Sequence, residues 1–164
     1  MTSSKSPTLA VRIERWPIAG GFTISRGAKT EAVTVVAQIS QGGHVGRGEC
    51  VPYPRYGETP EATMAAVLSL REAVGRGLDR GALQAAMPAC AARNALDCAL
   101  LDLEAKTSGR RAWNLLGRPA PRPCTTAYTI SLATPKAMAA ATAKAAHRPL
   151  LKIKLGGDGD AKRI

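Results

Sequence analysis

Near residue 150 the sequence contains the run Leu150-Leu151-Lys152-Ile153-Lys154-Leu155, in which two lysines alternate with apolar residues. Successive side chains of a β-strand point to opposite faces, so this run predicts a strand that turns both ammonium groups to one side. Thr125 to Ser131 predicts an earlier strand, and Thr134-Pro135 starts a helix that runs to about Ala146. Strand, helix and strand in this order indicate the βαβ unit from which parallel sheets are built.

The two lysines are the first candidate site. Their positions would lie roughly 7 Å apart, where two unit charges at an effective dielectric of about 20 repel by about 2.4 kcal/mol. Such repulsion favours the neutral form of one amine, which can then act as a general base, while its neighbour stays charged. The same spacing also fits an exposed strand face with solvated lysines, and the spacing alone leaves both interpretations open.

A proline-rich segment precedes the βαβ unit. Arg118-Pro119-Ala120-Pro121-Arg122-Pro123 can neither continue a helix nor enter a central strand. It therefore predicts a boundary between a first domain, residues 1–122, and a second, residues 123–164. From Cys124 to Ile164 there are only 41 residues, whereas a closed (β/α) barrel takes about 250. We therefore expect the second domain to be incomplete.

The first domain has α+β patterning. Three strands are expected from alternating apolar residues, and they predict an antiparallel meander with one covered face: Leu9 to Trp16, which Pro17 and Gly20-Gly21 interrupt, Glu31 to Ser40, and His44 to Cys50. Helices are expected from caps and helical spacing at Thr59 to about Val74, Asp79 to Met87, about Ala89 to Thr107, and Trp113 to Leu116.

Composition and charge limit the classes of function. The 164 residues are 45% hydrophobic and 21% charged, which is ordinary for a globular protein. The formal net charge of +11 is concentrated in residues 109–164, which hold 11 Lys/Arg against 2 Asp/Glu. These basic residues are scattered rather than clustered, so nucleic-acid binding is not predicted.

Neither cysteine chemistry nor a membrane span is indicated. Cys50, Cys90, Cys98 and Cys124 show no paired spacing that would indicate a zinc site or a disulfide framework. No apolar run approaches the roughly 18 residues of a membrane span, and residues 1–7 include no apolar signal segment. The expectation is a cytoplasmic protein with no membrane partner.

Two acidic residues of the helix at 89–107 are expected to be structural. Taken alone, Asp97 and Asp102 would be candidates for catalytic carboxylates. On this helix, however, Asp102 and Lys106 form an i,i+4 pair, which indicates a structural role. The segment Gly156-Gly157-Asp158-Gly159-Asp160 lacks the ending of a phosphate-binding loop and predicts a turn that opens the next helix.

Five motifs are spread along nearly the whole chain: Phe22-Thr23-Ile24-Ser25-Arg26-Gly27; Gly48-Glu49-Cys50-Val51-Pro52-Tyr53 with Arg55-Tyr56-Gly57-Glu58-Thr59; Ala95-Leu96-Asp97-Cys98-Ala99-Leu100-Leu101-Asp102-Leu103; Tyr128-Thr129-Ile130-Ser131; and Lys152-Ile153-Lys154. Together they resemble the amino-terminal part of the enolase superfamily, in particular its muconate-lactonizing and mandelate racemase group. Within that group, the two loop motifs favour the dipeptide epimerases of L-Ala-D/L-Glu type.

The resemblance implies an α+β capping domain followed by the start of a (β/α) TIM-like barrel. It implies an isomerase that inverts the α-carbon of a dipeptide through an enediolate, with Mg²⁺ binding the substrate carboxylate. The implied partner is a small-molecule dipeptide, and a homo-oligomer is compatible with the same family. A muconate cycloisomerase or an o-succinylbenzoate synthase stays open as an alternative, and so does a non-catalytic basic binding module.

The resemblance also assigns roles to residues. Lys154 would be the acid/base on one face of the substrate, assisted by Lys152. Arg26 would bind a substrate carboxylate, or would be a solvated loop arginine. Tyr56 would shape the substrate pocket or pack as an ordinary tyrosine, and Thr129 would bond the ligand or a backbone group. The metal ligands and the opposing base would belong to later barrel strands, so we expect the 164 residues alone to be inactive and to hold no intact Mg²⁺ site.

Overall fold

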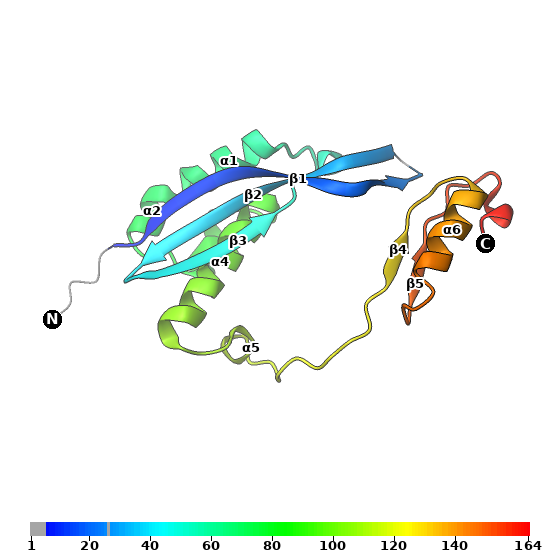
Figure 1. The fold of residues 1–164 in the computed structure, drawn as a ribbon. Helices are drawn as coiled ribbons and strands as arrows, with labels where there is room; N and C mark the ends of the chain where they lie inside the picture. Colours follow the sequence, from blue (N-terminus) through cyan, green and yellow to red (C-terminus); the bar gives the residue numbers. More distant parts are fainter. Residues whose placement is uncertain (1–5, 26) are drawn as a thin grey trace. The chain divides into compact units, whose positions relative to one another are not determined.

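The computed structural model describes residues 6–25 and 27–164 (Figure 1). They group into two compact units, one formed by the residues up to Arg15 with Val33–Pro121, the other by Trp16–Ala32 with Arg122–Ile164. The segment Trp16–Ala32 therefore groups with the end of the chain rather than with its sequence neighbours. The domain boundary expected at residues 122 and 123 stays a prediction.

A three-stranded sheet in the order β1-β2-β3 runs through the first part of the chain. Its strands are β1 (Thr8–Ile24), β2 (Gly27–Gln41) and β3 (His44–Cys50). β2 and β3 are antiparallel, and Gln41 lies opposite His44 next to the turn. Val35, Ala37 and Ile39 of β2 are completely buried, as the alternating pattern predicts. The structure confirms the antiparallel meander with one covered face.

Two strands are longer than the sequence predicts. β1 continues through Pro17 and Gly20-Gly21 to Ile24, where an interruption is expected. Because β1 lies at the edge of the sheet, the missing amide hydrogen of Pro17 need not break a ladder. Gly20 and Gly21 have φ of +74° and +71°, an irregularity that glycine tolerates without ending a strand. β2 likewise begins at Gly27 instead of Glu31.

The helices that follow the sheet in the first unit are α1 (Pro60–Ser69), α2 (Arg71–Gly75), α3 (Arg80–Ala86), α4 (Ala91–Ser108) and α5 (Ala112–Leu115). Two of them, α1 and α3, begin at their predicted caps, Thr59 and Asp79. Thr59 Oγ1 accepts a hydrogen bond from the Ala62 amide at 3.1 Å, and Asp79 Oδ1 accepts one from Ala82 at 2.7 Å. The helix expected from Thr59 to about Val74 is divided at Leu70, whose amide bonds to the carbonyl of Val67 instead of continuing the α-helical pattern.

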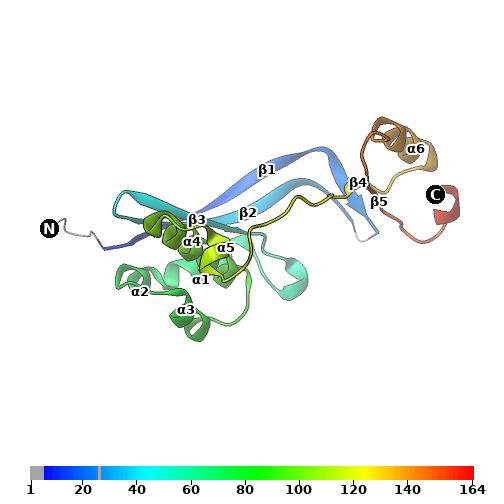
Figure 2. The same cartoon turned by 90° about the horizontal axis from the view of Figure 1, so that it is seen from below.

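Helix α4 packs directly on β3, because two glycines of the strand permit backbone contact (Figure 1). A Cβ on Gly46 would lie 2.2 Å from the carbonyl oxygen of Ala99, and a Cβ on Gly48 would lie 2.0 Å from that of Ala95. Ala95 and Ala99 are completely buried in this contact. The core of the first unit therefore lies between the sheet and its helices, which cover one side of the strands (Figure 2).

The second unit contains the βαβ arrangement. Its elements are β4 (Tyr128–Ile130), α6 (Pro135–Lys144) and β5 (Leu151–Ile153). β4 and β5 are parallel. Both strands are shorter than predicted, although hydrogen bonds from Tyr128 to Leu150 and from Lys154 to Ile130 extend the pairing by a residue at each end. Among the described residues, no helix is long and apolar enough to cross a membrane.

Candidate functional site

Three of the five predicted site residues share one face of the β4–β5 pair. On the other face, Ile130 is buried against Met138 of α6, and Leu151 packs beside them. Alternation places Lys152 and Lys154 on the face away from Ile153 and Leu151. Thr129 is the register partner of Lys152, so it lies on the same face as both lysines. The structure therefore brings a hydroxyl and two amines together.

The two lysines differ in their surroundings. Lys152 is exposed, whereas Lys154 is half-buried. The ammonium nitrogen of Lys154 lies 5.7 Å from the centre of the Phe22 ring, which is within the range of a cation–π contact. Phe22 belongs to the last part of β1, within the second unit. The sequence patterns include Phe22 only as part of a motif and do not predict this contact, because it joins segments far apart in the chain.

The loop after β5 is held in place by Asp160. Its carboxylate accepts hydrogen bonds from the amides of Gly156-Gly157, at 3.0 Å for Gly156 and 2.6 Å for Gly157. These bonds lower the pKa of Asp160 below its usual value. Arg163 Nε donates to the carbonyl of Ala133 at 3.1 Å. The loops that follow β4 and β5 are therefore tied together. The segment is a turn, as predicted, and it leads into the 3-10 helix η2 (Asp160–Lys162).

Tyr56 belongs to the first unit. It ends the 3-10 helix η1 (Pro54–Tyr56), and its side chain is 76% exposed. The carboxylate of Glu58 anchors this loop, because it accepts hydrogen bonds from the amide of Tyr53 at 2.9 Å and from the amide of Ala91 at 2.7 Å. A cavity of about 450 Å³ adjoins the loop. Arg26, the remaining predicted site residue, lies outside the described residues.

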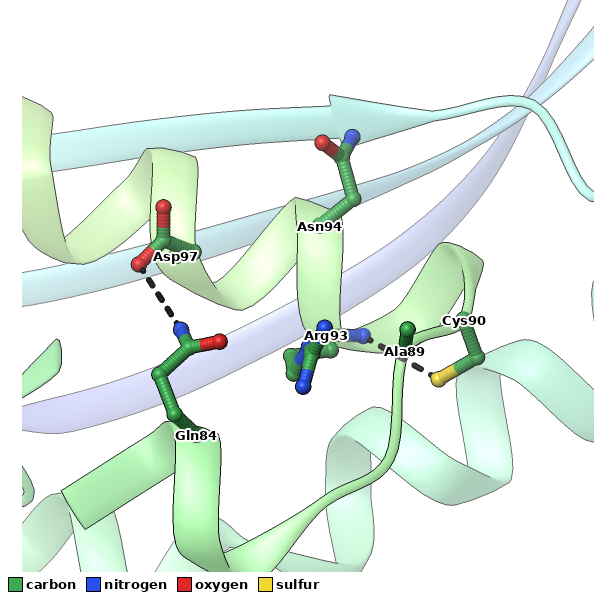
Figure 3. A pocket seen from close by; sticks show the side chains of 6 residues that line it. All are labelled: Gln84, Ala89, Cys90, Arg93, Asn94 and Asp97. Atoms are coloured by element: carbon green, nitrogen blue, oxygen red, sulfur yellow. Dashed lines mark hydrogen bonds between the residues drawn. The ribbon is translucent and has the colours of Figure 1, made fainter. Parts of the chain in front are cut away.

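A second pocket of the first unit has polar walls. Figure 3 shows the residues that line it, which are Gln84, Ala89, Cys90, Arg93, Asn94 and Asp97. Its charged groups have hydrogen-bond partners: Asp97 accepts from Arg80, outside the lining, at 2.9 and 3.1 Å and from Gln84 at 3.4 Å. Arg93 donates to the carbonyl of Met87 at 3.2 Å. These contacts confirm the structural role expected for Asp97.

Asp102 also has a structural role, as the i,i+4 spacing predicts. It accepts hydrogen bonds from the Arg47 amide at 2.8 Å and from Lys106 Nζ at 2.6 Å. Lys106 Nζ donates in addition to the carbonyl of Val45 at 2.7 Å. Partial burial opposes ionisation of Asp102, but the bonds from Lys106 and Arg47 outweigh it and lower the pKa of this carboxyl. The pair therefore ties α4 to β3.

The cysteines show no catalytic arrangement in the described residues. All four are free thiols. Burial, reinforced by the nearby carboxylate of Glu58, raises the pKa of Cys50 to about 11. A thiol with this pKa stays protonated at neutral pH and is a poor nucleophile.

Residues 6–25 and 27–164 do not fit a metal site. No group of three or more His, Cys, Asp or Glu side chains in these ranges could hold a metal ion. Two carboxylates, Asp158 and Asp160, follow the two lysines closely in sequence, and Asp160 is engaged by backbone amides and Arg163. These two ranges therefore do not provide the oxygen ligands that Mg²⁺ requires.

Comparison with known proteins defines the class. Residues 6–117 match the family described as mandelate racemase/muconate lactonizing enzyme, N-terminal domain. The chain therefore belongs to the mandelate racemase/muconate lactonizing enzyme family, and the resemblance to the enolase superfamily is confirmed. The meander and helices of the first unit belong to the capping domain of that family.

Two similar proteins are connected with dipeptide epimerases. The chain is 44% identical over 150 residues to L-Ala-D/L-Glu epimerase of Escherichia coli K12, a match that covers 90% of this chain and 47% of the relative. A solved enolase family member from Agrobacterium tumefaciens is 54% identical, with a TM-score of 0.90, over 96% of this chain and 48% of that one. It is described as homologous to dipeptide epimerases, with bound sodium and L-Ala-L-Glu.

A third relative holds magnesium. The dipeptide epimerase from Enterococcus faecalis V583, solved with Mg and L-Leu-L-Tyr, is 25% identical with a TM-score of 0.83. It is matched over 98% of this chain and 48% of that chain. The chain thus spans about half the length of the relatives it matches.

Proposed function

We propose that these residues provide the capping domain and one acid/base strand of a dipeptide epimerase, an isomerase that inverts the α-carbon of a dipeptide such as L-Ala-D/L-Glu. The main supporting observation is the common face of Thr129, Lys152 and Lys154. The identity of 44% with an E. coli epimerase supports the same activity. The half-buried position of Lys154 makes it the better acid/base of the two lysines.

In the proposed reaction, Lys154 Nζ accepts the α-proton from the carbon beside the substrate carboxylate. The electron pair of the broken C–H bond moves into the carboxylate to form an enediolate, and a proton returned to the opposite face inverts the centre. Lys152 would hold the substrate carboxylate. The opposing acid/base would come from outside these 164 residues.

Substrate contacts are assigned in the same proposal. Thr129 would donate its hydroxyl hydrogen to the ligand from the lysine face. Arg26 would bind a side-chain carboxylate of the substrate, since its guanidinium fork matches a carboxylate. Tyr56 would shape the pocket for the dipeptide. Each assignment can be tested by substitution.

The cofactor proposal concerns residues outside this chain. Mg²⁺ is the metal of the Enterococcus relative, and the proposal places its ligands beyond these 164 residues. No step of the reaction is assigned to the metal, because the described residues do not fit a site for it. A cytoplasmic location, the absence of a nucleic-acid partner and a homo-oligomeric state also remain proposals.

The alternatives have less support. The E. coli and Agrobacterium relatives are named as an epimerase or described as homologous to epimerases, which disfavours a cycloisomerase or a succinylbenzoate synthase. For a basic binding module, the relevant test is affinity for an acidic polymer that falls steeply with salt.

The proposed function is tested by incubating the protein, expressed with any residues that its reading frame encodes beyond Ile164, with L-Ala-L-Glu and Mg²⁺ in D₂O. We expect deuterium at the glutamate α-carbon and formation of L-Ala-D-Glu. Lys154→Ala should abolish inversion, whereas Lys136→Ala, an exposed lysine of α6, should not change it. Absence of both deuterium and inversion in the unsubstituted protein would reject the proposal.

A further inference from the structure

The aromatic ring of Phe22 and the amine of Lys154 are in contact within the second unit. The ammonium nitrogen lies 5.7 Å from the ring centre, and both side chains are half-buried. The face of an aromatic ring carries partial negative charge, so it attracts a cation placed over it. Lys152, two residues earlier on the same strand face, is exposed. The contact therefore distinguishes the two lysines.

A second, independent contact holds Phe22 in this position. The amide of Leu132, two residues beyond β4, donates a hydrogen bond of 3.1 Å to the carbonyl of Thr23. Thr23 is the neighbour of Phe22, so the backbone that carries the ring is bonded to the end of β4. Because β4 is paired with β5 as far as the amide of Lys154, ring and amine are placed by one continuous hydrogen-bonded framework.

The loop beyond Lys154 passes close to the side chain of the same residue, Leu132. A Cβ on Gly156 would lie 2.7 Å from a methyl carbon of Leu132, so the chain after β5 passes close to the end of β4. Asp160 and Arg163 tie the two loops further. The backbone on both sides of the Lys154 contact is thus held, and the ring of Phe22 lies over the amine that this backbone carries.

We propose that Phe22 is a positioning residue for Lys154: its ring covers one side of the amine, restricts the side chain to one region of the strand face and keeps bulk water from that side. The contact itself is independent of the reaction, but its catalytic meaning rests on the proposed function. Lys152, which is exposed, remains able to act as a charged group beside it.

The contact is tested on the 164-residue chain by competitive acetylation. A trace of acetic anhydride is added at neutral pH, and the acetylation of Lys154 is measured relative to that of Lys152 by mass spectrometry of peptides cut at sites other than lysine. The reagent must reach the amine nitrogen, so a ring that covers one side of Lys154 should slow its acetylation. Phe22→Leu should raise the ratio about two- to five-fold, the factor expected for one cation–π contact.

Three further variants distinguish loss of the Phe22–Lys154 contact from a general loss of structure in the second unit. Phe22→Tyr keeps the ring and should leave the ratio as in the parent chain, while Phe22→Trp, with the stronger π face, should lower it. Tyr128→Leu is the matched control, because it removes a ring that lies 5.4 Å from Arg148 in the same unit. An unchanged ratio in Phe22→Leu, or an equal rise in Tyr128→Leu, would overturn the proposal. So would a Phe22→Trp ratio above that of Phe22→Tyr.

The effect of Phe22 on the proposed reaction is measured separately, by exchange of the substrate α-proton. In D₂O, the α-proton of each epimer is removed by a different base in a two-base reaction. Phe22→Leu should therefore slow exchange mainly for the epimer whose exchange Lys154→Ala blocks. Equal slowing of both epimers would show a merely structural effect and overturn the positioning role. If the unsubstituted protein exchanges neither epimer, the proposed function fails, whereas the acetylation result still decides the contact.

Discussion

Thr129 lies directly opposite Lys152 in the register of β4 and β5. Because both residues are on the face away from α6, a hydroxyl group stands beside two amines, those of Lys152 and Lys154. Such a face suits an anion, since hydrogen bonds to charged groups are stronger than those between neutral groups. Thr129 is therefore expected to contact the substrate rather than a backbone group.

Replacing Thr129 by valine tests that expectation. The side chain keeps its shape but loses the hydroxyl, so KM for the dipeptide should rise about tenfold or more, because a hydrogen bond to a charged group is worth about 1.5–3 kcal/mol. Steady-state kinetics measure it. Thr142→Val in α6 should leave KM unchanged. An unaltered KM in Thr129→Val would favour the alternative that the threonine bonds to backbone.

Removal of the Glu58 carboxylate should loosen the loop that carries Tyr56. Glu58→Ala deletes the acceptor of the Tyr53 and Ala91 amides, and each unmade bond to a carboxylate costs about 1–3 kcal/mol. Amide hydrogen exchange at these two positions should accelerate at least tenfold. Glu61→Ala, in the first turn of α1, should leave them unchanged. Unaltered exchange in Glu58→Ala would show that the loop is held by other contacts.

Gly48→Ala should destabilise the first unit strongly. The new Cβ would lie 2.0 Å from the Ala95 carbonyl and 2.6 Å from the Ala99 amide, so β3 and α4 must separate. Overpacking of this kind costs about 1–3 kcal/mol or more, which urea unfolding followed by far-UV circular dichroism can measure. Gly75→Ala is the control, because outside its own helix the nearest atom to its added Cβ would be the carbonyl oxygen of Pro7, at 3.8 Å. Equal stability of the two variants would contradict the close strand–helix contact.

Asp102 predicts a pH dependence of stability. Its pKa is lowered in the folded chain by Lys106 and the Arg47 amide, against partial burial, relative to about 3.9 in an unfolded chain. A carboxyl with a lowered folded pKa contributes stability above the unfolded value and loses it as pH falls through the folded one. The contribution should therefore be full at pH 6 and disappear below about pH 4.

The matching variant is Asp102→Asn. Its free energy of unfolding should be about 1 kcal/mol below that of the parent chain at pH 6, and the gap should shrink as the pH falls below 4. Glu72→Gln removes an exposed pair with Arg76, at 3.5 Å, and should change stability little. A gap in Asp102→Asn that does not depend on pH would contradict the assigned ion pair.

The sequence predicted the local elements well, because their causes are local. Thr59 and Asp79 cap helices through their own side chains, and the alternation at residues 152–154 is a property of any strand. The extent of β1 was not predictable from its own residues. Whether Pro17 ends a strand depends on which neighbour needs its amide, and only the position of β1 at the sheet edge decides that.

The candidate site was predicted only in part, because some of its contacts join residues far apart in the sequence. Alternation along β5 predicted the common face of the two lysines, and the family resemblance indicated Thr129, whereas the ring over Lys154 comes from Phe22, 132 residues earlier. No periodicity links such distant residues. The packing of α4 on β3 could have been predicted from the sequence. Gly46 and Gly48 lie inside a strand, which indicates the close approach of another backbone, and α4 makes that approach.

The central claim is that Lys154 is the acid/base on one face of the substrate. The most direct measurement is α-proton exchange in D₂O by the Lys154→Ala protein, followed by NMR for L-Ala-L-Glu and L-Ala-D-Glu separately. The account predicts that exchange falls by about 10² to 10⁴ for one epimer, while the other epimer still exchanges without inversion. Equal exchange of both epimers at the rate of the unsubstituted protein would contradict it.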